Sequence, residues 1–242
     1  MGLSYFDLLS PNPVPIVGIG GIVSPKLRDI SAIGYNTYQY YLSIIQMDFK
    51  DLSFITGQKA PINPPDIFDL FLTDNSFTSL MQTILNFFLE EDVSYSDIHK
   101  AFLLQKNNVI SGMITKDNYP QVREAICLRN CICQRQEADL SKAKSKKALE
   151  IMKKLQKGRV QKAKQNKTDH NMELGNIISA VANKSPSLNI LNIWDLTIYQ
   201  IWDCFSRISN NSIYDIQSMS VAAWGDNDNR FDASAWFKRV DM

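Results

Sequence analysis

A lysine-dense segment, residues 142–167, divides the chain into two parts. It holds 11 of the 26 Lys and Arg residues of the chain and one acidic residue, Glu150, so its net charge is +10. Because the whole chain sums to +1, residues 1–141 sum to −5 and residues 168–242 to −4. The near-neutral total therefore conceals a strongly basic spacer between two acidic bodies.

The two acidic parts have the composition of folded protein. Hydrophobic residues make up 45% of the chain, which is enough for a core, and many of them recur three and four positions apart, as in amphipathic helices. We predict a mainly α fold in three parts: an N-terminal helical body with one small β-hairpin, residues 1–138; a basic helical spacer, residues 139–171; and a C-terminal helical unit, residues 172–242.

Helix boundaries in the N-terminal body are predicted from capping residues. Prolines and glycines dominate residues 11–25 and favour an extended arm or a short hairpin. Ser24 is predicted to cap the helix that follows, and Gly34 to interrupt or kink that helix. Ser76 is predicted to cap a later helix that carries a clean apolar stripe.

Two runs with β character, residues 101–105 and 109–115, are joined by three residues that include two asparagines. Because asparagine tolerates positive φ, this pattern predicts a hairpin. Asp117, or Thr115 before it, is predicted to cap the next helix.

The strongest local signal lies near the C-terminus. Thr197 and Gln200 form a T-x-x-Q capping box in front of an apolar helix face. Asn210 and Asn211 are predicted to end or bend this helix, and a second helix is predicted to stop at Gly225.

Patterns of nucleotide and metal sites are incomplete. The stretch Gly18–Gly21 lacks the third glycine of a dinucleotide fingerprint, and no G-K-[ST] follows, so we interpret it as a structural turn. Cys127, Cys131 and Cys133 read C-x3-C-x-C, which is not the spacing of zinc pairs or iron–sulfur loops, and buried helix cysteines are favoured.

Patterns of catalytic sites are also incomplete. The carboxylate pairs at residues 90–91 and 226–228 lie in polar surroundings and are interpreted as caps and solvated turns. His99 could serve Ser94 or Ser96, but nothing resembles G-x-S-x-G, so a surface histidine is favoured. We predict no catalytic residue, no metal site, no cofactor and no enzymatic activity.

The basic segment could contact the phosphates of a nucleic acid, because clustered cations release counterions on binding. The candidate contacts are Lys146, Lys147, Lys153 and Lys154. No Phe, Trp or Tyr for base stacking lies between residues 130 and 193, and no base-reading motif is present. A solvated helix or linker is therefore favoured, and cations that face the acidic bodies are a third interpretation.

All four tryptophans lie in the last fifty residues. Trp202 falls within an apolar helix face and is predicted to lie in the core. The candidate partner-binding residues are Trp194, Trp224, Trp236 and Phe237. For Trp224 and Trp236 a small satellite core is the favoured alternative.

Three stretches carry a resemblance: LRDISAIGYNTYQYYLSII, MITKDNYPQVREAI, and LTIYQIWDCFSRI followed by YDIQS. They are similar to small accessory proteins from the tail-morphogenesis gene cluster of tailed bacteriophages, especially those of low-GC Gram-positive hosts. The resemblance implies a non-enzymatic role with no catalytic residues. It implies either a tail assembly chaperone that keeps the tape measure protein soluble, or a minor tail or baseplate component of the virion.

The implied partners are tape measure or baseplate proteins in an oligomeric assembly. The implied location is the host cytoplasm during assembly, or the virion tail. No membrane association is expected, because prolines and glycines interrupt the longest apolar run, residues 14–23. Nucleic-acid binding through residues 142–167 is the second alternative function.

Overall fold

The computed structural model describes residues 2–47, 66–132, 170–226 and 230–239. Within these residues it contains eight α-helices and two small antiparallel sheets, so the fold is mainly α, as predicted. The sequence had indicated one small hairpin beside a possible extended arm, and the structure has two sheets. No described helix is both long enough and apolar enough to cross a membrane.

The N-terminal segment is a short helix followed by a hairpin. The element bounds are α1, Tyr5–Leu9; β1, Val14–Ile16; and β2, Gly20–Ile22. The two strands pair antiparallel, with Val14 opposite Ile22, which confirms a hairpin in the proline- and glycine-rich stretch. Gly18 has φ +76°, a value that glycine adopts without steric cost.

Ser24 does not cap a helix, and this prediction was wrong. The helix α2, Leu27–Ile33, begins after Lys26. The hydroxyl of the buried Ser24 instead donates a hydrogen bond to the backbone oxygen of Arg129 at 3.0 Å, which ties the end of the hairpin to a later helix. Gly34, with φ +85°, separates α2 from α3, Tyr35–Gln46, as predicted.

The next two helices form much of the core, and their bounds are α5, Ile67–Phe71, and α6, Asn75–Phe88. The cap of α6 is Asp74, not Ser76: the Asp74 carboxylate accepts from the backbone nitrogen of Ser76 at 2.7 Å. An aspartate two positions earlier therefore performs the role that was assigned to the serine.

The second sheet has three antiparallel strands in chain order: β3, Asp92–Ser96; β4, Ala101–Lys106; and β5, Val109–Ile114. The predicted hairpin is β4 and β5, and its turn consists of Asn107 and Asn108, which both have positive φ. The helix α7, Tyr119–Arg129, follows, and its N-cap is Asn118, not Asp117 or Thr115.

The C-terminal region contains α9, Leu174–Lys184, a 3-10 turn η3, Ile193–Asp195, and the long helix α10, Ile198–Trp224. The capping box of α10 is confirmed, because the side chains of Thr197 and Gln200 each accept from the backbone nitrogen of the other residue. The predicted helix end at Asn210 and Asn211 is wrong, since α10 is continuous through both. Gly225, with φ +77°, ends the helix as predicted.

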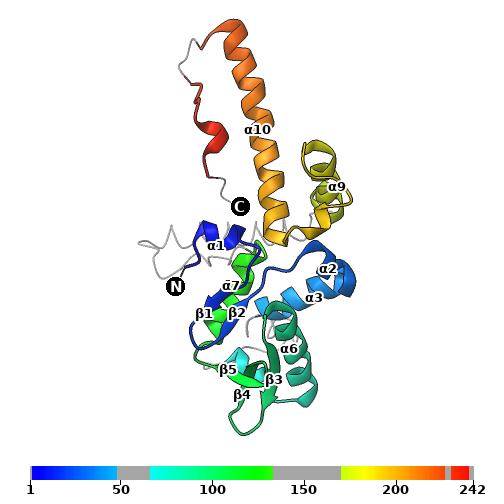
Figure 1. Cartoon of the computed structure of the whole chain (residues 1–242), viewed down its shortest axis with the longest axis vertical. Helices are drawn as coiled ribbons and strands as arrows, with labels where there is room; N and C mark the ends of the chain where they lie inside the picture. The colour runs from blue at the N-terminus through cyan, green and yellow to red at the C-terminus, as the bar shows by residue number, and fades with distance from the viewer. Residues whose placement is uncertain (1, 48–65, 133–169, 227–229, 240–242) are drawn as a thin grey trace, which may run out of the picture.

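One hydrophobic core joins the hairpin, α2, α3, α5, α6, β3, β4, β5, α7 and α9 with the first turn of α10. It includes residues on both sides of the predicted boundary at residue 138. The last fully buried core residue in the described chain is Ile201, so most of α10 lies beyond the core. Figure 1 shows α10 projecting from the body, with the C-terminal segment beside it.

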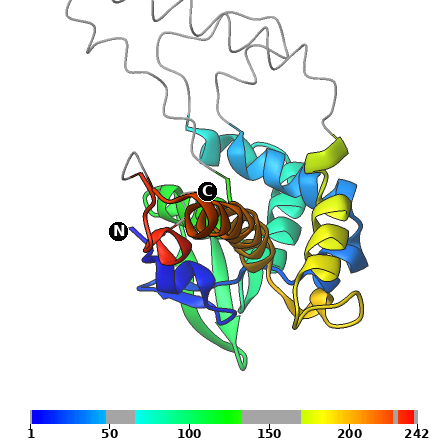
Figure 2. The ribbon, with the colours of Figure 1, turned by 90° about the horizontal axis from the view of Figure 1, so that it is seen from above.

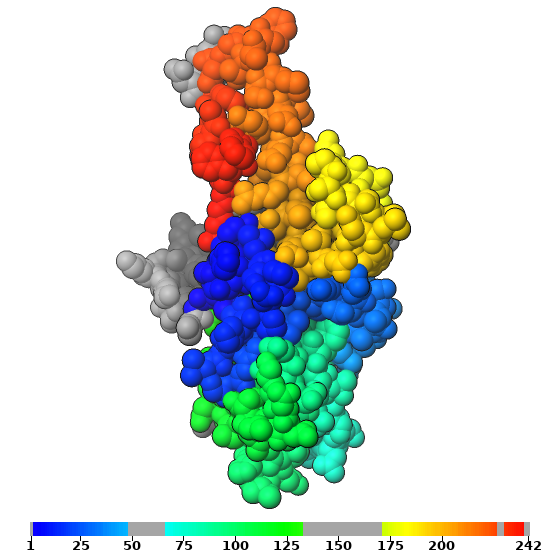
Figure 3. Space-filling model, in the orientation of Figure 1, coloured from blue at the N-terminus to red at the C-terminus, as the bar shows by residue number. Residues whose placement is uncertain are grey.

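The surroundings of α10 differ on its two sides. Viewed from above, α9 lies on one side of α10 and the C-terminal segment on the other (Figure 2). The space-filling view shows that the upper part of α10 and this segment form a projection above the body (Figure 3). The predicted basic spacer lies outside the described residues, apart from its last two residues, 170–171.

Candidate protein-interaction site

The base of α10 is held to the start of α2 by backbone hydrogen bonds. The nitrogen of Leu27 donates to the oxygen of Leu196, and the nitrogen of Ile198 donates to the oxygen of Pro25, each at 2.9 Å. The side chains of Arg28 and Asp195 form an ion pair beside this junction. The direction in which α10 leaves the body is therefore set by two backbone bonds to the N-terminal part of the chain.

The helix α1 supports the next turn of α10. The Gln200 side chain donates to the backbone oxygen of Leu9 at 2.9 Å, and the Tyr5 hydroxyl donates to the Asp203 carboxylate at 2.5 Å. Arg207 in turn donates to the Tyr5 hydroxyl at 3.1 Å. Burial of the ring raises the pKa of Tyr5, which keeps its proton available to Asp203.

The distal half of α10 carries a stripe of exposed apolar side chains, Ile213, Ile216 and Met219, which we term the distal stripe. Their exposed fractions are 52%, 65% and 63%. Their spacing of three residues places them as successive neighbours along one side of the helix. Burial of these apolar side chains against another protein would be favourable, so the distal stripe is a candidate contact surface.

The distal half of α10 is also nearly uncharged. From residue 208 to residue 224 the sequence has one charged residue, Asp215. Burial of a charge costs far more than burial of a neutral group, and charge depletion distinguishes the centre of protein interfaces from other surfaces. The composition of this half therefore suits a protein contact better than a purely solvated helix.

The C-terminal tail, residues 230–239, runs back along α10. The ring of Phe231 packs on that of Tyr214, with centroids 5.5 Å apart, and the Tyr214 hydroxyl donates to the Ala233 oxygen at 3.4 Å. Nearer the body, Arg207 donates to the backbone oxygen of Lys238 at 2.8 Å. The tail is thus antiparallel to α10 and covers the side that carries Tyr214.

The predicted partner-binding residues divide into two groups. Trp224, Trp236 and Phe237 are exposed by 82%, 54% and 59%, so no described satellite core covers them. Trp236 and Phe237 lie in a 3-10 turn of the tail, η4, Ala235–Phe237, with ring centroids 5.1 Å apart, and we term this pair the tail aromatic pair. Trp194, in η3, is partly buried against the core and is not brought together with the others.

The proximal half of α10 contacts the core through large aromatic side chains. Trp202 and Phe205 are partly buried against it, with ring centroids 6.2 Å apart. Trp202 therefore packs on the core, as predicted. The spacing of Ile213 and Ile216 predicts one face of a helix, and the low charge of residues 208–224 was the signal that this face is exposed.

The glycine-rich stretch binds a protein carboxylate. The buried side chain of Glu91 accepts from the backbone nitrogen of Gly21 at 2.9 and 3.2 Å. A Cβ atom on Gly20 would lie 2.5 Å from the Glu91 Oε2 atom, so a larger residue would displace this side chain. A bound phosphate would need the backbone nitrogen of Gly21, but this nitrogen already donates to the Glu91 carboxylate. This contact supports the interpretation of residues 18–21 as a structural turn.

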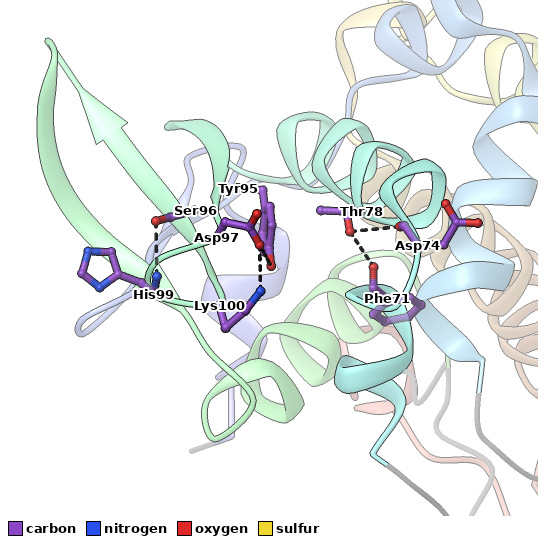
Figure 4. A network of polar contacts seen from close by, with 8 residues as sticks. All are labelled: Phe71, Asp74, Thr78, Tyr95, Ser96, Asp97, His99 and Lys100. Carbon is purple, nitrogen blue, oxygen red and sulfur yellow. Dashed lines mark hydrogen bonds and ion pairs between the residues drawn. The ribbon is translucent and has the colours of Figure 1, made fainter.

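Figure 4 shows the turn between β3 and β4, where Ser96 and His99 lie close together. The Ser96 hydroxyl accepts from the backbone nitrogen of His99 at 3.4 Å, while the imidazole ring points away from it. Asp97 pairs with Lys100 at 2.8 Å, so it does not orient the imidazole. His99 is an exposed residue of a turn, as predicted.

The remaining predicted positions have structural partners or lie outside the described residues. Glu90 pairs with Lys106 at 3.1 Å, and Asp226 accepts from two backbone nitrogens of the tail. Cys127 is buried in α7, and burial raises the pKa of its thiol. Cys133, Asp228, Lys146, Lys147, Lys153 and Lys154 lie outside the described residues. Within the described ranges, no group of three His, Cys, Asp or Glu residues could hold a metal ion.

The projecting site lies within a region that matches a known protein family. A family model described as YomV second domain matches residues 162–241, a range that contains α9, α10 and the tail. No curated protein and no solved structure matches the chain. The family match supports a phage-associated protein.

Proposed function

We propose that this chain is a non-enzymatic assembly protein of a bacteriophage, which binds a partner protein through α10 and the C-terminal tail. One observation carries the proposal: α10 projects beyond the core and, together with its tail, displays large apolar side chains to solvent. Apolar side chains that stay in contact with water raise the free energy of the folded chain. A partner protein that covers α10 and its tail would remove this apolar surface from water.

Within phage assembly, we assign the protein to tail morphogenesis. The support is the resemblance of three sequence stretches to accessory proteins of tail gene clusters, one of which forms the capped start of α10. In this role the chain acts as a tail assembly chaperone, and the tail aromatic pair contacts apolar segments of the tape measure protein. Paired aromatic side chains contribute large contact areas at a low cost in conformational entropy.

Co-expression with the tape measure protein of the same phage, followed by co-purification, tests this function. We expect the two proteins to associate. The variant Trp236→Ala/Phe237→Ala should bind at least about tenfold more weakly, because aromatic residues dominate the energetics of interfaces. The matched control is Phe6→Ala, which removes an aromatic side chain that is 81% exposed on α1.

The outcomes separate the related roles. Association in infected cells without incorporation into virions is expected for a chaperone. The protein in purified virions would instead indicate a minor tail or baseplate component. No association with the tape measure protein, together with absence from virions, would overturn the proposal.

A further inference from the structure

We propose that Tyr5 of α1 is the positioning residue of the C-terminal tail, and that it sets the orientation in which the tail aromatic pair is displayed. The inference rests on the proposed function in that the tail aromatic pair is taken as the contact site. It adds the N-terminal helix α1 to that site, although α1 and the tail are far apart in the sequence. The end of the tail lies beside α1 in two perpendicular views (Figures 1 and 2).

The tail is attached at two points, and the tail aromatic pair lies between them. In the far attachment, the ring of Phe231 packs on Tyr214, whose hydroxyl donates to the oxygen of Ala233. In the near attachment, Arg207 donates to the backbone oxygen of Lys238. Both side chains of the pair are more than half exposed, so their own packing contributes little to the orientation of η4. The two attachments therefore determine how the pair is displayed.

The near attachment converges on the hydroxyl of Tyr5. This hydroxyl donates to the Asp203 carboxylate and accepts from one terminal nitrogen of Arg207 at 3.1 Å. The other terminal nitrogen of Arg207 donates to the oxygen of Lys238 at 2.8 Å. Because a guanidinium is planar and its donors are fixed relative to one another, the Tyr5 hydroxyl determines where the nitrogen that holds the tail lies.

The ring of Tyr5 makes a second contact with the tail. The guanidinium carbon of Arg239 lies 5.1 Å from the centroid of this ring. Cation–π attraction acts at distances up to about 6 Å from the centroid. The hydroxyl and the ring of one tyrosine therefore hold two successive residues of the tail, Lys238 through Arg207 and Arg239 directly.

The helix α1 has supports that do not involve Tyr5. The guanidinium of Arg129, a residue with no exposed surface, donates to three backbone oxygens at 2.7, 3.1 and 3.0 Å, those of Asp7, Ser10 and Asn12. These acceptors lie in α1 and in the segment directly after it. Substitution of Tyr5 should therefore release the tail and leave α1 in place.

Nuclear magnetic resonance of the full chain tests the positioning without a partner protein. The ¹⁵N heteronuclear NOE of the backbone amides of residues 234–238 reports motion on the picosecond-to-nanosecond timescale. We expect values close to those of α10 in the original chain and values typical of a flexible segment in Tyr5→Ala. Tyr5→Phe, which keeps the ring, should give intermediate values. The matched control is Tyr40→Ala, at a tyrosine of α3 that is 50% exposed, and it should leave the values unchanged.

A second variant tests the same contact from the side of the tail. Arg239→Ala leaves α1 unaltered and removes the cation above the Tyr5 ring. It should lower the heteronuclear NOE of residues 234–238, and its combination with Tyr5→Ala should lower the values no further than Tyr5→Ala alone. The circular dichroism spectrum of each variant should match that of the original chain.

Binding of the tape measure protein tests the display of the pair. Only molecules whose tail has the bound orientation are competent, so a competent fraction of about one tenth lowers the apparent affinity about tenfold. We expect Tyr5→Ala to bind at least about tenfold more weakly than the original chain. In the background of Trp236→Ala/Phe237→Ala, Tyr5→Ala should cause no further loss, because Tyr5 acts through the pair. A further loss would indicate direct contact of Tyr5 with the partner and would overturn the positioning role.

The two proposals fail in different ways. Heteronuclear NOE values that are unchanged in Tyr5→Ala, or that fall equally in Tyr40→Ala, would overturn the role of Tyr5 even if the tail aromatic pair binds the tape measure protein. Release of the tail with unchanged binding would overturn it as well. If the original chain does not bind the tape measure protein, the proposed function fails, and the heteronuclear NOE still decides whether Tyr5 positions the tail.

Discussion

Tyr38 and Tyr119 are both buried in the core, but their hydroxyl groups have different surroundings. Their exposed fractions are 3% and 2%, and burial raises the pKa of both. The Tyr38 hydroxyl donates to the Asn130 side chain at 2.8 Å. The Tyr119 hydroxyl has no hydrogen-bond partner in the described part of the chain. A buried polar group without a partner lowers stability, so the same substitution should have different effects at the two positions.

We expect Tyr38→Phe to lower the free energy of unfolding by about 1–2 kcal/mol, because the buried oxygen of Asn130 loses its donor. Tyr119→Phe should leave the free energy of unfolding unchanged or raise it by up to about 1 kcal/mol, because it removes an unpaired hydroxyl. Urea unfolding at pH 7 measures both. Equal losses in the two variants would contradict this difference between the hydroxyl groups.

The two tyrosines also contribute to the loss of stability at alkaline pH. Their pKa values are raised in the folded chain above about 10, the value in the unfolded chain, because burial disfavours the phenolate. Their stabilising contribution is therefore complete below pH 10 and is lost as the pH rises further. The loss between pH 10 and 11 should be smaller in Tyr119→Phe.

At the scale of elements, the ends of α10 were predictable and its middle was not. The Thr197–Gln200 capping box and Gly225 are local signals that act on backbone groups nearby, so sequence alone locates both ends. Asn210 and Asn211 lower helix propensity by less than about 1 kcal/mol each, which a cooperative helix tolerates. The missed strand β3 has one buried residue, Val93, so its sequence lacks a clear apolar alternation.

One aspartate, Asp232, holds the turn η4 of the tail by accepting from the backbone nitrogen and the hydroxyl of Ser234. Hydrogen bonds from Lys238 and Ser234 lower the pKa of Asp232 to about 2. A lowered carboxyl pKa stabilises the folded tail above about pH 4 and loses this contribution as the pH falls towards 2. We therefore expect protonation of Asp232 to weaken its hydrogen bonds with Ser234 and Lys238 over this range, and the indole N–H resonance of Trp236 should shift as this happens.

Asp232→Asn provides the control for this acid transition. The amide carries no charge between pH 4 and 2, so the Trp236 resonance should no longer titrate in this range. A titration that is unchanged in Asp232→Asn would show that another group controls the turn.

At the scale of the whole molecule, the sequence predicts which residues of the candidate site are suited to a contact. It does not predict whether their side chains are exposed to solvent. Trp224, Trp236 and Phe237 were recognisable as contact residues from their chemistry. Whether they formed a satellite core depended on the path of the tail, which long-range contacts such as that between Arg207 and Lys238 determine. A local sequence pattern does not contain such contacts.

The charge distribution of the whole chain gives a further prediction. If residues 142–167 form the solvated linker that the sequence favours, replacement of Lys146, Lys147, Lys153 and Lys154 by Gln should leave any weak DNA binding unchanged and should alter stability by no more than about 1 kcal/mol. Gel shifts at several salt concentrations measure the binding. A gel shift at physiological ionic strength that these substitutions abolish would contradict us and favour phosphate contacts.

The hydrogen bonds at the base of α10 have a consequence for synthesis. Tyr5 and Asp203 are 198 positions apart in the sequence, and Leu9 and Gln200 are 191 apart, yet each pair is joined. A ribosome therefore releases most of the chain before α10 can dock on the N-terminal segment. Because closure of so long a loop is slow, the nascent chain acquires these orienting contacts only after residue 203 has left the ribosome. Chains that stop before residue 200 therefore lack both contacts between α10 and the N-terminal segment.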